Sequence, residues 1–179
     1  MATIFKVNDQ TIRPGKAWTD ANGIQHPGAW NTWPAEQKEA AGIVEVVQET
    51  PPDGRLYWWS HNDDGSINKT AKALDDAGSG DELVKGVKTN LKDEVNSQQG
   101  SLLSLTDWYV IRKADKGTAI PDAVQDYRDA IRAAGDEMKA AIDDAANTAA
   151  MAALFVTYTT NDDGSVSKSG ILYEWPELE

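Results

Sequence analysis

Clustered acidic residues are the first groups in this chain that could do chemistry. Two nine-residue stretches, 62–70 and 161–169, are near-copies that both begin Asn-Asp-Asp-Gly-Ser. A calcium ion needs several oxygen ligands that converge from one loop, and Asn, Asp and Ser side chains supply such oxygens. When the two glycines are aligned with the glycine of a calcium-binding loop, the last position holds Ala71 or Gly170 where a bidentate Glu is required. The pattern therefore favours two β-hairpin turns, in which Asp bonds its own backbone and Gly takes a positive φ.

The other residues with catalytic potential are isolated from one another. His26 and His61 each lack a second imidazole at metal-ligand spacing. Four Asp-Asp pairs sit in expected turns or on polar helix faces: 63–64, 75–76, 143–144 and 162–163. Well-solvated carboxylates of this kind act as turn formers and surface charge. No phosphate-binding loop or nucleophile elbow is present. We therefore expect no enzyme, no metal and no cofactor, and a hydrolase or metal-dependent enzyme is the weakest alternative.

The composition narrows the possible functions further. The 179-residue chain has 29 acidic and 17 basic residues, and its net charge of −12 repels the phosphates of nucleic acids. It has no cysteine, which excludes disulfides and thiolate zinc sites. No apolar run approaches the roughly 20 residues of a membrane span, and the first residues lack the basic-then-apolar order of a signal peptide. The composition predicts a soluble cytoplasmic protein that binds neither nucleic acid nor membrane.

One set of aromatic and basic residues suits protein–protein contact. Trp, Tyr and Arg dominate interface hot spots because they bury large areas at low entropic cost and still form hydrogen bonds. The partner-binding candidates of this type are Trp108, Tyr109, Arg112, Tyr127, Arg128, Arg132, Trp58 and Trp59. Arg128 and Arg132 share a helix face, and Asp107 opposite them would fix how two helices cross. An intramolecular clamp and a partner-binding face are both compatible with this pattern.

The first 76 residues are predicted to form a small antiparallel β module. They hold five of the seven Trp and five of the seven Pro. Strands are expected at 3–7, 15–19, 43–47 and 55–60. A turn at 20–23 makes one hairpin, and the last two strands, on either side of a Pro-rich loop, make a second. A short helix begins at Pro34 and ends near Gly42. In the second hairpin, Trp58 and Trp59 point to opposite faces, so one could face a core and the other solvent or a partner. Packing of both against other elements of a small sheet is the favoured alternative.

A polar, Gly-rich linker is predicted at 77–82, followed by a helical module at 83–179 that ends in a β-hairpin. Apolar residues form one helical stripe before residue 103: Val84, Val87, Leu91, Val95 and Leu102. A second helix, starting near Pro121, carries a heptad-like seam: Ile120, Val124, Tyr127, Ile131, Ala134, Met138, Ala141 and Ala145. Gly135 is expected to weaken or bend this helix.

Shorter elements complete the predicted helical module. One or two helical turns, capped at Thr106 or Asp107, lie between the two long helices and end at Gly117. A last short helix is expected at 147–154, and the hairpin strands are expected at 155–160 and 170–175. The predicted fold class is α+β.

The order of three signals in the helical module carries a resemblance to a known group of proteins. Leu102 and Leu103 are followed by Thr106-Asp107-Trp108 and then by Tyr127-Arg128-x-x-Ile131-Arg132. This order is similar to the Leu-Leu, Asp-Trp and Tyr-Arg-x-x-Leu-Arg pattern of bacteriophage tail-fibre assembly proteins, which are chaperone-like. The N-terminal run at 13–18, leading to Trp30, also looks like a module of phage tail accessory proteins.

The resemblance implies a non-enzymatic phage protein that binds a tail or tail-fibre protein during virion assembly, in the host cytoplasm. The chain departs from the family pattern after Trp108, where Tyr-Val-Ile-Arg-Lys-Ala replaces a short Pro- and Asp-rich loop. The alternative is therefore a permanent structural or adaptor subunit of the phage tail or virion. A heptad-like seam can close within one chain or between copies, so a homo-oligomer is also compatible with the pattern.

Overall fold

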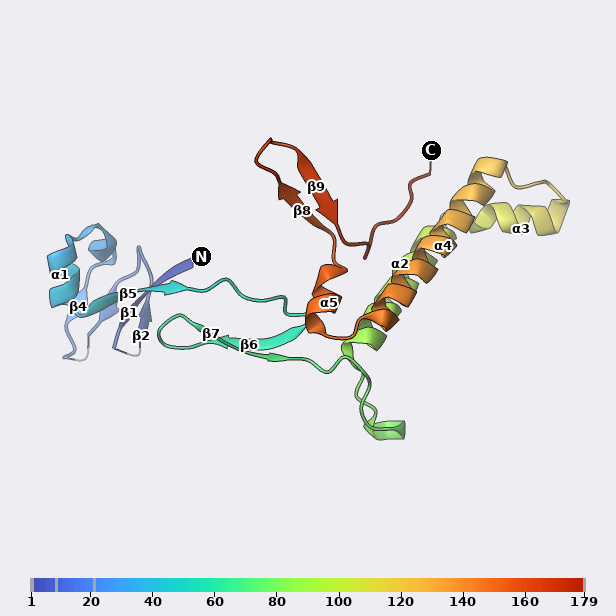
Figure 1. The fold of residues 1–179 in the computed structure, drawn as a ribbon. Helices are drawn as coiled ribbons and strands as arrows, with labels where there is room; N and C mark the ends of the chain where they lie inside the picture. Colours follow the sequence, from blue (N-terminus) through green and yellow to red (C-terminus); the bar gives the residue numbers. More distant parts are fainter. Residues whose placement is uncertain (1, 9, 21, 179) are drawn as a thin grey trace. The chain divides into compact units, whose positions relative to one another are not determined.

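The computed structural model describes residues 2–8, 10–20 and 22–178 (Figure 1). The chain divides into two compact units, Met1–Ala71 and Lys72–Glu179. The first unit holds antiparallel strands, and the second holds the long helices and a C-terminal hairpin. This α+β arrangement confirms the predicted fold class. In the part of the chain that is described, no helix has both the length and the apolar character needed to cross a membrane.

A three-stranded antiparallel sheet forms the centre of the first unit. Its strand order is β2 (Gln10–Ile12), β1 (Ala2–Val7), β5 (Ile43–Gln48). The smaller elements are β3 (Trp18–Thr19), β4 (Gln25–His26), η1 (Gly28–Thr32), α1 (Ala35–Ala40), β6 (Tyr57–His61) and β7 (Ile67–Ala71). Trp30 is fully buried in the core of this unit, where its ring meets the edge of Phe5 at a centroid distance of 5.1 Å. Trp30 and the second buried tryptophan of this core, Trp18, thus fill much of a small core.

Strand pairing in the first unit differs in part from the expected hairpins. β3 and β4 do form the hairpin around residues 20–23, of which Ala21 lies outside the described residues. Residues 15–17 are not a strand, because Gly15 turns the chain with a φ of 78°. The predicted pairing of 43–47 with 55–60 is wrong. β5 pairs with β1, and β6 pairs with β7. The tight Asn-Asp-Asp-Gly turn brings β6 next to β7, which follows it in the chain. The long Pro-rich loop between β5 and β6 does not force those two strands together.

Two long antiparallel helices, α2 (Val87–Ser104) and α4 (Asp122–Asp144), pack side by side in the second unit (Figure 1). The shorter elements are η2 (Gly80–Glu82), α3 (Asp107–Lys116), α5 (Thr148–Ala153), β8 (Thr157–Thr160) and β9 (Val166–Ser169). The predicted stripe is confirmed within α2, which buries Val87, Leu91 and Val95, while Leu102 is only partly buried. Val84 is exposed, because it precedes the helix and pairs with Ala77 across a short bridge.

The heptad-like seam predicted for α4 is confirmed in part, since Ile120, Ala134 and Ala141 are only partly buried. The buried seam residues are Val124, Tyr127, Ile131, Met138 and Ala145, to which the structure adds Ile142. Pro121 caps the helix at its N-terminus, and Gly117 ends α3 with a φ of 67°. The caps are therefore where the local signals place them, because each depends on only a few neighbouring residues.

The C-terminal hairpin forms around the second Asp-rich turn, but its second strand is shifted from the predicted range. β9 begins at Val166, directly opposite Thr160, and ends before Gly170. The expectation of a strand at 170–175 is wrong. The five-residue turn sets the register, and Gly170, with a φ of 84°, ends the strand.

Gly135 does not bend α4, which runs unbroken for 23 residues. Gly135 is buried, and the side-chain amide of Gln99 from α2 occupies the space that a Cβ would fill. Nε2 of Gln99 lies 3.2 Å from the carbonyl oxygen of Ile131 and 3.3 Å from that of Arg132, and donates to both. Gly135 therefore permits a close polar contact between the two helices.

Two glycine-to-alanine substitutions should differ in their effect on the free energy of unfolding of this helix pair. Gly100→Ala in α2 faces open space, so it should raise the free energy of unfolding by about 0.5–1 kcal/mol through helix propensity. Gly135→Ala should give a smaller gain or a loss, because the added methyl displaces the Gln99 amide from its two carbonyls. Urea unfolding of the two variants measures the difference. Equal gains would show that the Gln99 contact contributes nothing.

Candidate protein-docking site

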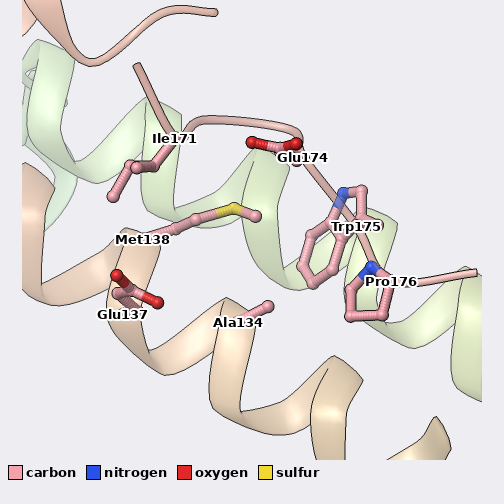
Figure 2. Close-up of a pocket in the computed structure, with 7 residues that line it drawn as sticks. All are labelled: Ala134, Glu137, Met138, Ile171, Glu174, Trp175 and Pro176. Carbon is pink, nitrogen blue, oxygen red and sulfur yellow. The ribbon is translucent and has the colours of Figure 1, made fainter. Parts of the chain in front are cut away.

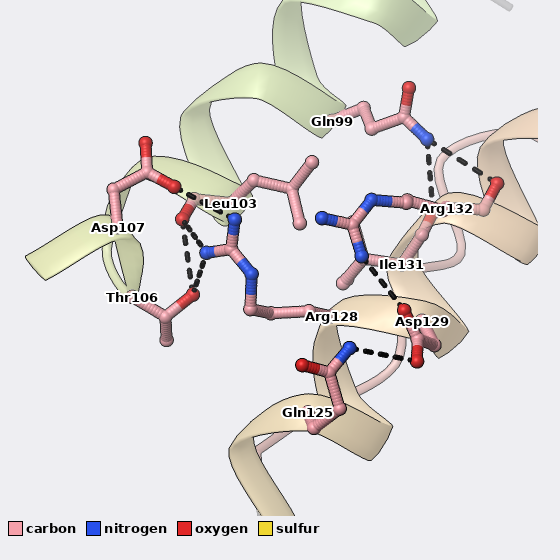
Figure 3. Close-up of polar contacts among 9 residues, drawn as sticks. All are labelled: Gln99, Leu103, Thr106, Asp107, Gln125, Arg128, Asp129, Ile131 and Arg132. Carbon is pink, nitrogen blue, oxygen red and sulfur yellow. Dashed lines mark hydrogen bonds and ion pairs between the residues drawn. The ribbon is translucent and has the colours of Figure 1, made fainter. Parts of the chain in front are cut away.

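A buried arginine joins α4 to the corner between α2 and α3. Nη1 of Arg128 donates to the carbonyl oxygen of Leu103 at 2.9 Å and to Oγ1 of Thr106 at 2.7 Å. Nη2 of Arg128 pairs with Oδ1 of Asp107 at 2.9 Å, and Figure 3 shows all three acceptors around one guanidinium. Only 6% of Arg128 is exposed. These residues form an intramolecular clamp, one of the two alternatives that the sequence left open.

The clamp determines the direction in which α3 leaves the helix pair. Thr106 is the N-cap of α3 and is itself buried, and Asp107 is the first residue of that helix. The Asp107 carboxylate also complements the positive N-terminal end of α3. Because a guanidinium presents its donors in a fixed plane, three simultaneous contacts restrain the rotation of this corner.

Arg132 and Tyr127, the other α4 candidates, do not join a common site. Arg132 pairs with Asp129 of its own helix at 2.8 Å, and close to half of its side chain is exposed. Tyr127 is buried in the seam. Of the two arginines expected to pair with Asp107, only Arg128 does so, and Arg132 pairs within its own helix. Neither Tyr127 nor Arg128 is accessible to a partner.

The remaining helical candidates form one compact cluster on α3. The rings of Trp108 and Tyr109 lie with their centroids 3.7 Å apart, and the guanidinium carbon of Arg112 lies 4.9 Å and 5.1 Å from the two rings. Such cation–π contacts stabilise by about 0.5–2 kcal/mol, depending on burial. Half of Trp108 is exposed. The cluster is therefore ordered by its own contacts and still presents an aromatic surface.

Apolar side chains extend this cluster into a surface that we call the α3 face, formed by Trp108 and Ile111 of α3 and by Leu105, two residues before the helix. Leu105 is 69% exposed and Ile111 is 67% exposed. A spacing of three residues places Trp108 and Ile111 along one side of α3, and Leu105 lies at the α2–α3 corner just before it. Single apolar residues on a surface are ordinary, but several exposed ones close together in the chain, beside an ordered aromatic cluster, are typical of an interaction surface. Sequence reasoning missed Leu105 and Ile111, although their spacing from Trp108 could have indicated them.

Trp58 and Trp59 belong to the first unit, on neighbouring positions of β6. Trp58 is 67% exposed and Trp59 is 40% exposed, so the expectation that one of them faces a core is wrong. β6 and β7 form a two-stranded ribbon, which has no sheet interior to receive an inward side chain. The ring of Trp59 meets the edge of His61 at a centroid distance of 5.4 Å.

Comparison of the chain with protein-family models, curated proteins and solved structures finds no match. A function is therefore argued from the exposed α3 face and from the order of the sequence motifs.

The histidines and acidic residues have structural contacts in the described part of the chain. His26 stacks on Trp18 at a centroid distance of 4.2 Å, and its Nε2 lies 3.1 Å from Asp20. Hydrogen bonds from the Ile24 amide and from His26 lower the pKa of Asp20. No group of three or more His, Asp or Glu residues with a geometry for metal binding occurs among residues 2–8, 10–20 and 22–178.

A surface groove lies between α4 and the C-terminal tail, with a volume of about 420 Å³ (Figure 2). Its lining includes Ala134, Met138, Ile171 and Trp175. The indole of Trp175 donates to Oε1 of Gln98 in α2 at 2.8 Å, which holds the tail against the helix pair. The lining residues offer apolar packing and two carboxylates, and none of them is a nucleophile. The groove is therefore best explained by packing of the tail.

Proposed function

We propose that this chain is a non-enzymatic phage protein that binds a tail or tail-fibre protein during virion assembly. The exposed α3 face, with Trp108 at its centre, is the observation that carries the proposal. An aromatic side chain flanked by Leu105 and Ile111 supplies the large apolar area typical of an interface hot spot, and Arg112 supplies a nearby cation.

Preorganisation by the clamp supports a docking role for α3. The contacts from Arg128 to Thr106 and Asp107 hold the start of the helix before any partner arrives. A surface that is already ordered loses less entropy on binding, so more of the contact energy contributes to affinity. The net charge of −12 disfavours nonspecific association of free copies, which suits a chain with exposed apolar side chains.

The choice of a phage tail or tail-fibre protein as the partner comes from the resemblance described above. Residues that carry it have two separate roles in this fold. Thr106, Asp107 and Arg128 build the clamp, and Trp108 lies in the exposed α3 face. The site of action is then the host cytoplasm during assembly, with the virion tail as the location in the alternative function.

Substitutions on α3 provide the test of docking. Trp108→Ala and Ile111→Asp should each weaken capture of tail proteins from infected cells by at least about tenfold, which corresponds to about 1.4 kcal/mol. Lys113→Ala is the matched control, because Lys113 lies two residues from Ile111 and points to the opposite side of the helix. The melting temperature should stay near that of the wild type in all three variants. If both α3-face variants capture tail proteins as well as the control does, α3 is not the docking surface.

Mass spectrometry of purified particles separates the two versions of this function. A transient assembly factor should be present far below the level of the tail proteins. A stoichiometric amount in mature virions would instead establish the permanent structural or adaptor subunit.

A further inference from the structure

The two Asp-rich repeats form hairpin tips with the same internal geometry. In each, the backbone amide of the opening Asn donates to the carbonyl of the closing Ser, at 2.9 Å for Asn62 and 2.8 Å for Asn161. The amide of that Ser donates to an Asp carboxylate at 2.9 Å in both tips. Bonds from the Ser lower the pKa of Asp64 and of Asp163 in the same direction. We call residues 62–66 the first tip and residues 161–165 the second tip.

The first tip is docked within its own unit. Nζ of Lys6 donates to Oδ1 of Asp63 at 2.8 Å and to its carbonyl oxygen at 3.2 Å. The amide of Glu49, just beyond β5, donates to the carbonyl of Gly65 at 2.9 Å. Gly65 is buried, and a Cβ at this position would collide with the backbone carbonyl of Val47. Lys6 and residues 47–49 therefore form an acceptor site for this turn.

A side-chain carboxylate of the acceptor site adds one more contact. Oε2 of Glu49 accepts the amide of Ile67 at 3.0 Å, directly after the first tip. Most of these contacts use the tip backbone, a glycine without a Cβ and one Asp side chain. Any turn with the same shape and an Asp in the same place carries the same docking groups.

The second tip carries these groups without using them in the described part of the chain. Asp162, Gly164 and Val166 stand where the first tip has Asp63, Gly65 and Ile67. All residues from 157 to 169 are exposed, and a Cβ on Gly164 would meet nothing within 4 Å. An isolated two-stranded ribbon is marginally stable, so contact with a partner would stabilise this hairpin.

We propose that the second tip docks on the acceptor site of another copy of this chain, in place of that copy's own first tip. Asp162 then pairs with Lys6, Gly164 lies on Val47, and the amide of Val166 reaches Glu49. Charge complementarity and the shared turn geometry both favour this occupant. Exchange of one tip for an equivalent one replaces contacts like for like, as in domain swapping.

The contact is head-to-tail and weak in the wild-type chain. It joins different surfaces of the two copies, so repetition gives a ring or a filament. The first tip has a local advantage, because Nε2 of His61 lies 3.1 Å from the carbonyl oxygen of Glu49, and Thr160 stands in its place in the second hairpin. The proposal uses neither α3 nor its partner, and it therefore goes beyond the docking function above.

Asn substitutions at the tip glycines provide the test, because Asn tolerates a positive φ and adds a Cβ. Gly65→Asn in the full-length chain should expel the first tip from the acceptor site through the collision with Val47. The association constant, measured by sedimentation up to millimolar concentration, should then rise at least tenfold above the wild type. Adding Gly164→Asn should return it to the wild-type value or below, since the second tip then carries the same obstruction.

Gly23→Asn is the control, because Gly23 has a φ of 81° and open space around it. It should associate as the wild type does. A second measurement uses zero-length carbodiimide crosslinking of mixed isotope-labelled and unlabelled Gly65→Asn chains, in which Lys6 of one copy should join Asp162 of the other. A monomeric Gly65→Asn chain, association that persists in the double variant, or the lack of this crosslink would each overturn the proposal.

Discussion

Replacing Ile131 with Asp is expected to unfold the α2–α4 pair. Ile131 is completely buried in the seam, as is Val95 of α2. A carboxylate at this position would lose its hydration, and Arg128, one turn earlier, already gives its donors to Leu103, Thr106 and Asp107. The expected loss in the free energy of unfolding is about 4 kcal/mol or more. Circular dichroism should show loss of helix at a temperature where the wild type is folded.

Ile111→Asp is the matched control for that experiment, since it makes the same chemical change on the exposed α3 face. Its free energy of unfolding should stay within about 0.5 kcal/mol of the wild-type value. A melting temperature for Ile131→Asp as high as that of Ile111→Asp would contradict the assignment of Ile131 to the seam. The same control weakens partner capture in the proposed function, so one variant separates folding from docking.

Arg128→Met should lower the free energy of unfolding of the second unit by about 2–3 kcal/mol. Methionine keeps much of the aliphatic stem, so the change isolates the guanidinium. Oγ1 of Thr106 loses a donor at a buried position, and the partly buried carbonyl oxygen of Leu103 loses one of its donors. Asp107 contributes less to the loss, because about half of its side chain is in solvent. Urea unfolding monitored by circular dichroism measures the change.

Arg132→Met removes the same group one turn further along α4. Its pair with Asp129 is exposed on both sides, so the expected loss is below about 0.5 kcal/mol. Similar losses for the two variants would mean that the clamp stabilises the corner no better than a surface ion pair. Arg128→Met should also weaken partner capture, although it changes no residue on the α3 face, because α3 is no longer held in one orientation.

Long-range pairing is the part of the fold that sequence reasoning predicted least well. The turn at 62–65 was recognised from its own residues, and it joins β6 to β7. β5 had no comparable local signal for its partner, which is β1, about 40 positions earlier in the chain. Hydrophobic alternation indicates that a strand exists, but many strands satisfy the same pattern, and only assembly of the core selects one.

The candidate site shows the same division between local and distant information. Arg128 and Arg132 have the same side chain on the same helix face, and the sequence could not distinguish a clamp from a docking group. The difference arises because the α2–α3 corner lies beside Arg128, whereas Arg132 meets Asp129 of its own helix. Gly135 likewise has a poor helix propensity, yet it is the place where Gln99 of α2 makes contact.

The sequence by itself determined the α+β class, the buried stripes of α2 and α4, the helix caps and the two matching turns. These features depend on residues within a few positions of one another, so spacing and side-chain chemistry are sufficient. The tertiary structure decided that β5 joins β1, that Arg128 is enclosed, that the α3 face is exposed and that the first tip is docked. Each of these depends on which distant groups meet and exclude water, and no local pattern contains that information.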